Sequence, residues 1–434
     1  MRKLFYLLCV LAGVLAFYGC GEKAPTNVPV SRPTQELPPH AAMPLYALQG
    51  ADGFSTGSGN GEGYFSISPV IRQNGSGNLR YTDYATRQTV TLCGQPNCTH
   101  SDESCTGWLA PGSGGVVPSV VGETLALVYL GTGDYDTWGA AALPHIETMN
   151  FDGSERRKIA EFKANERIEK PFFTDGQSLY FRLTTDQEKG RTASIRQIDL
   201  ATGENSQLCA LDADRVDWIW GAFDRSVLLY RTKEENGADP FEQVSGYQLY
   251  LLNIDTLEET PVFAWEAQEP MPNLFGSSLV VCNEKAGEVE VRDLRSGETF
   301  SFSQVRLPED PNTDFVVYDY RDGHLLYRVR KLKEHKPGIE SLVFYTADKE
   351  GGEPRVWDLQ YMFEGKAAAV TVIDTLATGQ YLVVKHEAYE QGAAQNEEGV
   401  PYYSNTPVRD YALIDAADYW EGIPRYIDIT DHTT

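Results

Sequence analysis

The residues whose types and spacing could support chemistry lie between positions 93 and 105. This segment reads CGQPNCTHSDESC, so Cys93, Cys98, His100 and Cys105 follow the pattern C-x4-C-x-H-x4-C. Three thiolates and one imidazole are an ordinary tetrahedral ligand set for a structural zinc ion. A disulfide between two of the cysteines would close a small loop and leave the third cysteine unpaired. Zinc, a disulfide and unlinked thiols all stay open. We expect a structural role for the segment, because a four-ligand zinc site leaves no position for a reacting water.

The N-terminus predicts export. Arg2 and Lys3 precede an apolar run, Leu4–Tyr18, that has the length of a secretory hydrophobic region and is short for a membrane-spanning helix. Gly19 and Cys20 then resemble the lipobox of bacterial lipoproteins, in which the cysteine is lipidated and becomes the new N-terminus. We therefore expect residues 1–20 to be a lipoprotein signal peptide ending at lipidated Cys20. The protein would then be anchored in the bacterial cell membrane by its lipid, facing outside the cytoplasm.

The export prediction affects the cysteine segment. Exported cysteines tend to oxidise, which supports a disulfide. Of the seven cysteines in the chain, five remain once Cys9 is removed and Cys20 is lipidated. An odd number cannot all pair, and a histidine stands among the three clustered cysteines, which favours a metal. Cys209 and Cys282 lie in apolar, strand-like runs and are expected to be buried thiols.

Composition divides the rest of the chain in two. Residues 21–44 are rich in Pro, Thr and Ser with little apolar periodicity, which is typical of a flexible tether. Residues 45–434 are expected to form one domain. The formal net charge of −25 excludes nucleic acid as a partner and disfavours adhesion to an anionic bilayer, so the membrane contact is the lipid.

A repeat of roughly 50 residues runs through this domain. Its recurrent unit is a tight turn followed by a short run rich in Leu, Val and Tyr. The turns lie at Glu62-Gly63, Val121-Gly122, Asp175-Gly176, Asp224-Arg225, Phe275-Gly276, Asp322-Gly323 and Thr378-Gly379.

A second hairpin, often with glycine in its turn, follows each apolar run at some distance, as in IRQIDLATGENSQLCAL. Each repeat is therefore interpreted as a four-stranded antiparallel meander. Meanders at this period predict an all-β fold, a β-propeller of four-stranded blades, with seven blades expected and six or eight as the margin.

This pattern resembles TolB-like propeller domains, and especially uncharacterised β-propeller lipoproteins of gram-positive bacteria. In those lipoproteins an early strand ending in Leu-Cys runs into a Cys-x4-Cys-x-His segment, as Leu92 to His100 does here. The resemblance implies a propeller and brings no established activity with it.

The longest segments fall between the second and third strands of the repeats, so all are expected to emerge on one face, where binding residues concentrate in rigid scaffolds. They are Leu130–Pro144, Thr184–Thr192, Thr232–Gly246, Arg330–Gly338 and Ala388–Pro407. The cysteine segment is expected on the same face, in the crossover from the first repeat to the second. Candidate binding residues in the long segments are Asp134, Asp136, Trp138, Arg330, Lys333, Tyr402 and Tyr403.

Acidic and aromatic side chains suit a sugar or a cation, whereas the basic ones suit a carboxylate or a phosphate. We expect a binding or protein-interaction module for an unknown small ligand, glycan or protein. The alternative is a carbohydrate-active hydrolase or lyase on the same scaffold. No catalytic residue is assigned, because the chain has no HExxH, phosphate-loop or dinucleotide motif.

Overall fold

The computed structural model divides the chain into two units, Met1–His40 and Ala41–Thr434, and all described residues belong to the second. The structure describes residues 43–48, 57–68, 76–110, 115–131, 138–212, 217–234, 244–283, 286–334, 338–395 and 401–433. Cys20 and the predicted tether up to residue 42 lie outside these ranges, so the signal peptide, the lipid anchor and the tether stay predictions. Within the described ranges, the helices are too short to cross a membrane.

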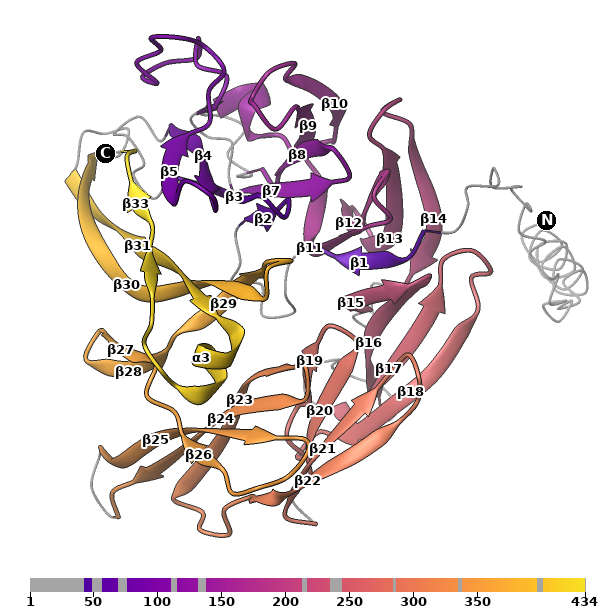
Figure 1. Ribbon diagram of the computed structural model, residues 1–434. Helices are drawn as coiled ribbons and strands as arrows, with labels where there is room; N and C mark the ends of the chain where they lie inside the picture. Colours follow the sequence, from indigo (N-terminus) through magenta and orange to yellow (C-terminus); the bar gives the residue numbers. More distant parts are fainter. Residues whose placement is uncertain are drawn as a thin grey trace, which may run out of the picture. The chain divides into compact units, whose positions relative to one another are not determined.

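Strands make up almost all of the regular structure (Figure 1). In the first half they are β1 (Leu45–Ala47), β2 (Ser58–Gly59), β3 (Gly63–Ile67), β4 (Gly77–Asp83), β5 (Gln88–Thr91), β6 (Trp108–Leu109), β7 (Val116–Val121), β8 (Thr124–Tyr129), β9 (His145–Met149), β10 (Arg157–Glu161), β11 (Glu166–Thr174), β12 (Ser178–Gln187), β13 (Gly190–Asp199) and β14 (Asn205–Leu211). The 3-10 helix η1 (Gly139–Ala142) lies between β8 and β9.

In the second half the strands are β15 (Trp218–Asp224), β16 (Ser226–Glu234), β17 (Val244–Asn253), β18 (Glu259–Glu266), β19 (Asn273–Phe275), β20 (Ser278–Asn283), β21 (Glu288–Asp293), β22 (Thr299–Arg306), β23 (Thr313–Arg321), β24 (His324–Leu332), β25 (Ile339–Asp348), β26 (Arg355–Val356), β27 (Gln360–Phe363), β28 (Lys366–Ala369), β29 (Thr371–Thr375), β30 (Gln380–Gln395), β31 (Pro401–Asp415), β32 (Ile427–Asp428) and β33 (Thr430–Asp431). The helix α3 (Ala416–Glu421) follows β31.

Consecutive strands pair into four-stranded antiparallel meanders. These are β2–β5, β7–β10, β11–β14, β15–β18, β19–β22, β23–β26 and β29–β32, and β27–β28 forms a separate hairpin. The first turn of each repeat needs a left-handed backbone, which glycine adopts at Gly176 (φ 86°) and Gly323 (φ 84°). The sequence-based prediction of repeated meanders is therefore confirmed, whereas the blade number stays a prediction.

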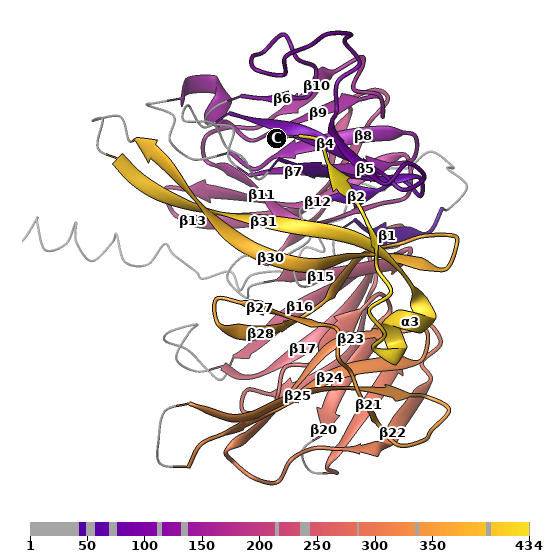
Figure 2. The ribbon, with the colours of Figure 1, turned by 60° about the vertical axis from the view of Figure 1, so that its left-hand side comes forward.

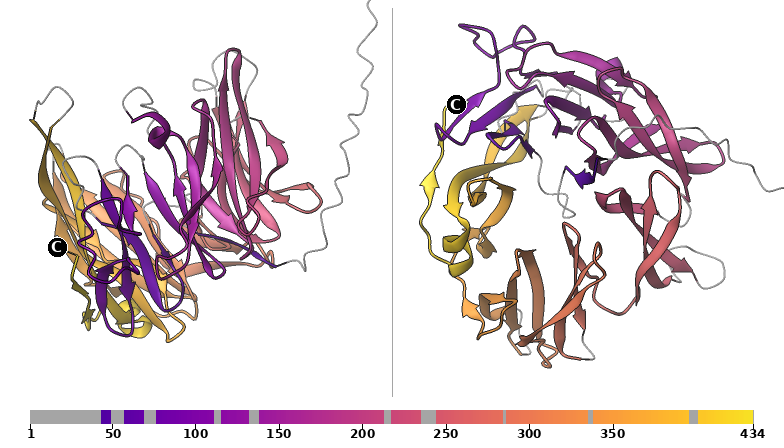
Figure 3. Two further views of the ribbon diagram at one scale, coloured as in Figure 1. Left: turned by 90° about the horizontal axis from the view of Figure 1, so that it is seen from above. Right: turned by 45° about the vertical axis from the view of Figure 1, so that its right-hand side comes forward.

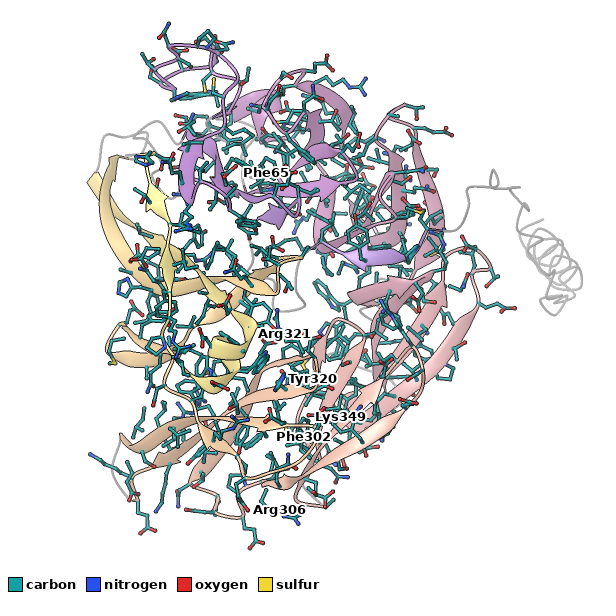
Figure 4. All side chains as sticks on the ribbon, in the orientation of Figure 1. Phe65, Phe302, Arg306, Tyr320, Arg321 and Lys349 are labelled. Carbon is teal, nitrogen blue, oxygen red and sulfur yellow. The ribbon has the colours of Figure 1, made fainter. Side chains whose placement is uncertain are left out.

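Apolar clusters lie between successive meanders and close them into a ring. Leu127 of β8 packs in one cluster with Phe65 of β3, and so joins the first meander to the second. Corresponding clusters join each later pair of neighbours. Between β19–β22 and β23–β26, for example, the Tyr320 ring lies 6.3 Å from that of Phe302 (Figure 4). Because a last cluster joins Leu382 of β30 to Tyr64 of β3, the ring is closed and the fold is a β-propeller.

Two short strands join distant parts of this ring. β1 pairs with β11 through Tyr46 and Thr174, and with β15 through Tyr46 and Phe223, so it links two meanders into one nine-stranded sheet. β33 adds in parallel to β5, and its Asp431 receives a 2.7 Å hydrogen bond from the buried Arg80 guanidinium. Neither pairing is expected from the repeat pattern.

Two of the predicted long loops are paired strands. Thr184–Thr192 forms the ends of β12 and β13, where Thr185 is opposite Thr192. Most of Ala388–Pro407 belongs to the β30–β31 hairpin, with Tyr389 opposite Pro407. Both strands of each pair therefore extend further than the sequence predicts, because antiparallel pairing satisfies the backbone donors and acceptors as well as water does in a loop. Both hairpins still join the second strand of a meander to the third, as the sequence predicts.

Candidate metal centre

The cysteine segment interrupts the outer strand of the first meander. β5 and β6 both pair with β4, and the chain leaves the sheet between them. Residues 92–107 form this excursion from the sheet, and its neck is where the outgoing and returning legs meet. There the Leu79 N–H donates to the Gly107 carbonyl (2.8 Å) and the Leu92 N–H donates to the Leu79 carbonyl (2.9 Å). The expectation that the segment forms the crossover to the second meander was wrong, because the chain returns to finish the outer strand before crossing.

The four expected ligands come together at this neck. The Sγ atoms of Cys93, Cys98 and Cys105 and a ring nitrogen of His100 all lie within 4.8 Å of one another. The His100 Nδ1 atom is 3.3 Å from Cys105 Sγ. Cys105 is buried, the other three are half-buried, and the three cysteines are not disulfide-bonded. This group, called the cysteine cluster below, could hold a metal ion.

Each sulfur in the cluster accepts a hydrogen bond from the backbone two residues further along the chain. The donors are the N–H groups of Gln95 to Cys93, of His100 to Cys98 (3.4 Å), and of Gly107 to Cys105. Tight turns make this possible, with left-handed backbones at Asn97 (φ 59°) and His100 (φ 55°). Hydrogen bonds of this kind orient thiolate ligands and stabilise their charge. The backbone is therefore arranged for sulfur in its ionised, metal-binding form.

The thiol pKa values show that the three thiols need a compensating positive charge to ionise together. Burial opposes ionisation of Cys93, but hydrogen bonds from Gln95 and Thr106 outweigh it and lower the pKa of Cys93 to about 6. Burial, together with the charge on Cys93, raises the pKa of Cys105 to about 12. Neighbouring thiolates repel one another, so they do not all ionise together without a compensating charge. A bound divalent cation would supply that charge.

The second meander braces the returning leg of the excursion. Arg156 donates from Nη1 to the carbonyl of Thr106 (3.0 Å) and is held in place by Glu147 (2.8 Å). Gly153, in the turn between β9 and β10, lies so close that a Cβ atom there would be 3.1 Å from Thr106 Oγ1. The cluster thus lies where the first two meanders meet, and a metal there would fix the excursion against both.

The other candidate residues are spread over several meanders. Trp138 precedes η1 and is 38% exposed. Arg330 lies on β24, and Lys333, exposed, follows the end of that strand. Tyr402 and Tyr403 lie on β31 opposite Ala394 and Ala393, and their side chains are outside the described part, as are Asp134 and Asp136. Among the described positions, Arg330 and Lys333 share one hairpin, and Tyr402 and Tyr403 share another.

Sequence reasoning missed two partners of Arg330 and its neighbour Arg328. Tyr318 and Asp314 of β23 form a hydrogen-bonded network with these two arginines of β24. Arg328 and Arg330 stand at alternate positions of one strand, which places both on one face of a sheet. That alternation was visible in the sequence, but the acidic partner on the neighbouring strand was not.

No protein-family model and no curated protein matches the chain, whereas solved β-propeller structures do. One is dipeptidyl peptidase 4 of Porphyromonas gingivalis, with a TM-score of 0.45 and 11% identity over 85% of this chain and 51% of that one. The β-propeller domain of the Trilobed protease from Pyrococcus furiosus gives 0.44 and 11%, covering 88% and 99%. TolB from Acinetobacter baumannii gives 0.30 and 10%, covering 83% and 77%. The chain spans about half the length of the dipeptidyl peptidase that it matches.

Proposed function

We propose that this protein is a lipid-anchored, extracytoplasmic β-propeller that binds a small ligand, a glycan or a partner protein through one face of its ring. The anchor would be the lipid on Cys20, which holds the body at the bacterial cell membrane. The binding face would be the side on which the hairpins between second and third strands end. We call it the hairpin face.

The observation that carries this proposal is the shared direction of the longest hairpins. The ends of β12–β13, β16–β17, β24–β25 and β30–β31 that meet at these hairpins point to the same side, and α3 lies on the other (Figures 2 and 3). β30 and β31 are 16 and 15 residues long, far beyond the mean strand. Side chains presented by a rigid scaffold in this way are suited to recognition.

The proposal includes one structural zinc ion in the cysteine cluster. The ligand atoms are close enough to share an ion, and the backbone donates a hydrogen bond to each sulfur. Four protein ligands would fill the tetrahedral shell, so the ion would have no position for substrate. It would stabilise the fold and leave recognition to the hairpin face.

Binding is favoured over the carbohydrate-active alternative because two acidic side chains on the innermost strands are paired with arginines. Glu169 of β11 pairs with Arg182, and Asp319 of β23 pairs with Arg321 at 2.9 Å. A glycosidase requires two carboxylates that flank the bond to be broken, one as acid and one as base or nucleophile. A carboxylate neutralised by a buried arginine is poorly suited to either role.

Photo-cross-linking on intact cells tests the binding face. A photoreactive amino acid would be placed at Glu188, between β12 and β13, or at Lys333, after β24. The matched control is Ser296, an exposed turn residue at the opposite end of its meander. We expect adducts from the first two positions and none from Ser296. Equal adducts from all three positions, or none from the hairpins, would contradict the proposal.

A further inference from the structure

An unusual charge arrangement lies on one face of the β23–β24 pair. Arg330 is opposite Asp314, and Arg328 is opposite Val316. Directly opposed residues of antiparallel strands place their side chains on the same face. Tyr318 joins them, because its hydroxyl accepts a 2.9 Å hydrogen bond from Arg328 Nη1. Asp314, Val316, Tyr318, Arg328 and Arg330 are called the arginine-pair site below.

Two guanidinium groups share one carboxylate oxygen at this site. Arg328 and Arg330 both donate from Nη2 to Oδ2 of Asp314, Arg328 at 3.4 Å. The exposed fractions of the two arginine side chains are 14% and 34%. The site therefore carries one uncompensated positive charge in a partly desolvated position, where charge interactions are stronger than in water.

Several polar atoms of this site have no partner. The Nε atoms of both arginines and Oδ1 of Asp314 are buried without a hydrogen bond. Leaving charged donors unsatisfied is costly, and the cost is greatest in a low-dielectric position. An oxyanion offers acceptors for guanidinium groups in the planar, bidentate geometry that arginine prefers.

The position of the site suits a ligand that arrives at the hairpin face. Asp314 stands near the start of β23 and Arg330 near the end of β24, and both of these ends belong to the hairpin face. Val316 is 36% exposed and adds an apolar contact beside the charges. In a chain with a net charge of −25, a local positive site also draws anions that the rest of the surface repels.

We propose that the arginine-pair site binds the oxyanion group, a carboxylate or a phosphate, of the ligand that the hairpin face recognises. This inference rests on the proposed function and narrows its ligand class. Arg328 and Arg330 hold the anion through their guanidinium groups. Asp314 orients both arginines and, by its own charge, limits how tightly the anion is held.

Calorimetric titration of the full-length protein in detergent tests this site, with inorganic phosphate and sodium acetate as probes at constant ionic strength. We expect Arg330→Gln and Arg328→Gln each to weaken binding by about tenfold or more, as loss of a charge-assisted contact does. Asp314→Asn should strengthen it several-fold, because the competing carboxylate is removed. That opposite sign is not expected from a general loss of structure.

Arg306→Gln is the matched control, since it removes an arginine that is 66% exposed and paired with Glu288 on another meander (Figure 4). Its affinity for the probes should equal that of the wild type, and thermal melts should show all variants folded.

The two probes separate the possible sources of the oxyanion. Preference for phosphate indicates a phosphorylated ligand, and preference for acetate indicates a carboxylated one. Wild-type protein that binds neither probe, or Arg306→Gln that weakens binding as much as Arg330→Gln, would overturn the proposal.

The two proposals fail in distinguishable ways. If hairpin cross-links persist in cells but neither probe binds, the oxyanion site is overturned and the binding face stands. If the probes bind through Arg330 but the hairpin positions give no adducts, the binding face fails and the oxyanion site stands.

Discussion

At the scale of single residues, the cysteine cluster depends on contacts that are nearly all local. Cys93, Cys98 and Cys105 each receive a backbone hydrogen bond from a residue two positions on, and His100 stands between the second and third of them. Such short-range geometry explains why the four ligands could be grouped from their spacing alone. What they hold is decided by chemistry, because the same thiols can bind zinc or oxidise.

We predict one zinc ion per chain, lost on Cys105→Ser. Removing a ligand from a structural site reduces metal affinity and the stability coupled to it, so the melting temperature should fall by several degrees. Native mass spectrometry and thermal denaturation would measure both effects. Cys209→Ser, on β14 and outside the cluster, should keep the ion and the melting temperature. A metal-free chain two mass units below its reduced mass would show a disulfide instead.

At the scale of elements, the excursion between β5 and β6 depends on close backbone approach at its neck. A Cβ atom at Gly107 would lie 2.1 Å from the Leu92 carbonyl oxygen, a distance that no side chain tolerates. Glycine is therefore required where the returning leg rejoins the sheet. Because Gly107 also donates to Cys105, the neck and the cysteine cluster form one unit.

Gly107→Ala should consequently destabilise the protein by about 2–3 kcal/mol, the range of overpacking in a tight site. It should also release the metal, because the N–H of residue 107 moves away from Cys105. Urea unfolding and metal content would be measured together. Gly77→Ala is the control, since its Cβ would meet only Leu109 Cδ1 at 3.9 Å. Equal stability of the two variants would contradict this role of the neck.

At the scale of the whole ring, a half-buried carboxyl group lies where the first and last meanders meet. The Tyr84 hydroxyl, just after β4, donates a short hydrogen bond to Asp374 of β29. Burial raises the pKa of Asp374, although hydrogen bonds from Tyr84 and from the Thr375 N–H oppose that shift. Keeping Asp374 ionised where the ring closes therefore costs folding free energy.

This arrangement predicts that the stability of the protein depends on pH through Asp374. The folded state binds the Asp374 proton more tightly than the unfolded chain does. Its contribution to stability is therefore complete below the unfolded pKa and is lost as pH rises toward the folded pKa. Asp374→Asn, which keeps an acceptor for Tyr84, should raise the melting temperature at pH 7.5 and leave it almost unchanged at pH 4. Thermal melts across pH would show this, with the exposed Asp358→Asn as the control. A lower melting temperature for Asp374→Asn at pH 7.5 would refute it.

The sequence by itself determined the repeat, the strand alternation, the turn glycines and the grouping of Cys93 with His100 and Cys105, because all of these are properties of neighbouring residues. Period-two alternation shows which side of a strand is buried, but not which other strand it meets. Only the tertiary structure therefore placed Asp314 between Arg328 and Arg330 and inserted β1 between β11 and β15. It alone also added β33 to β5, since pairing at a sheet edge uses backbone groups that every residue carries.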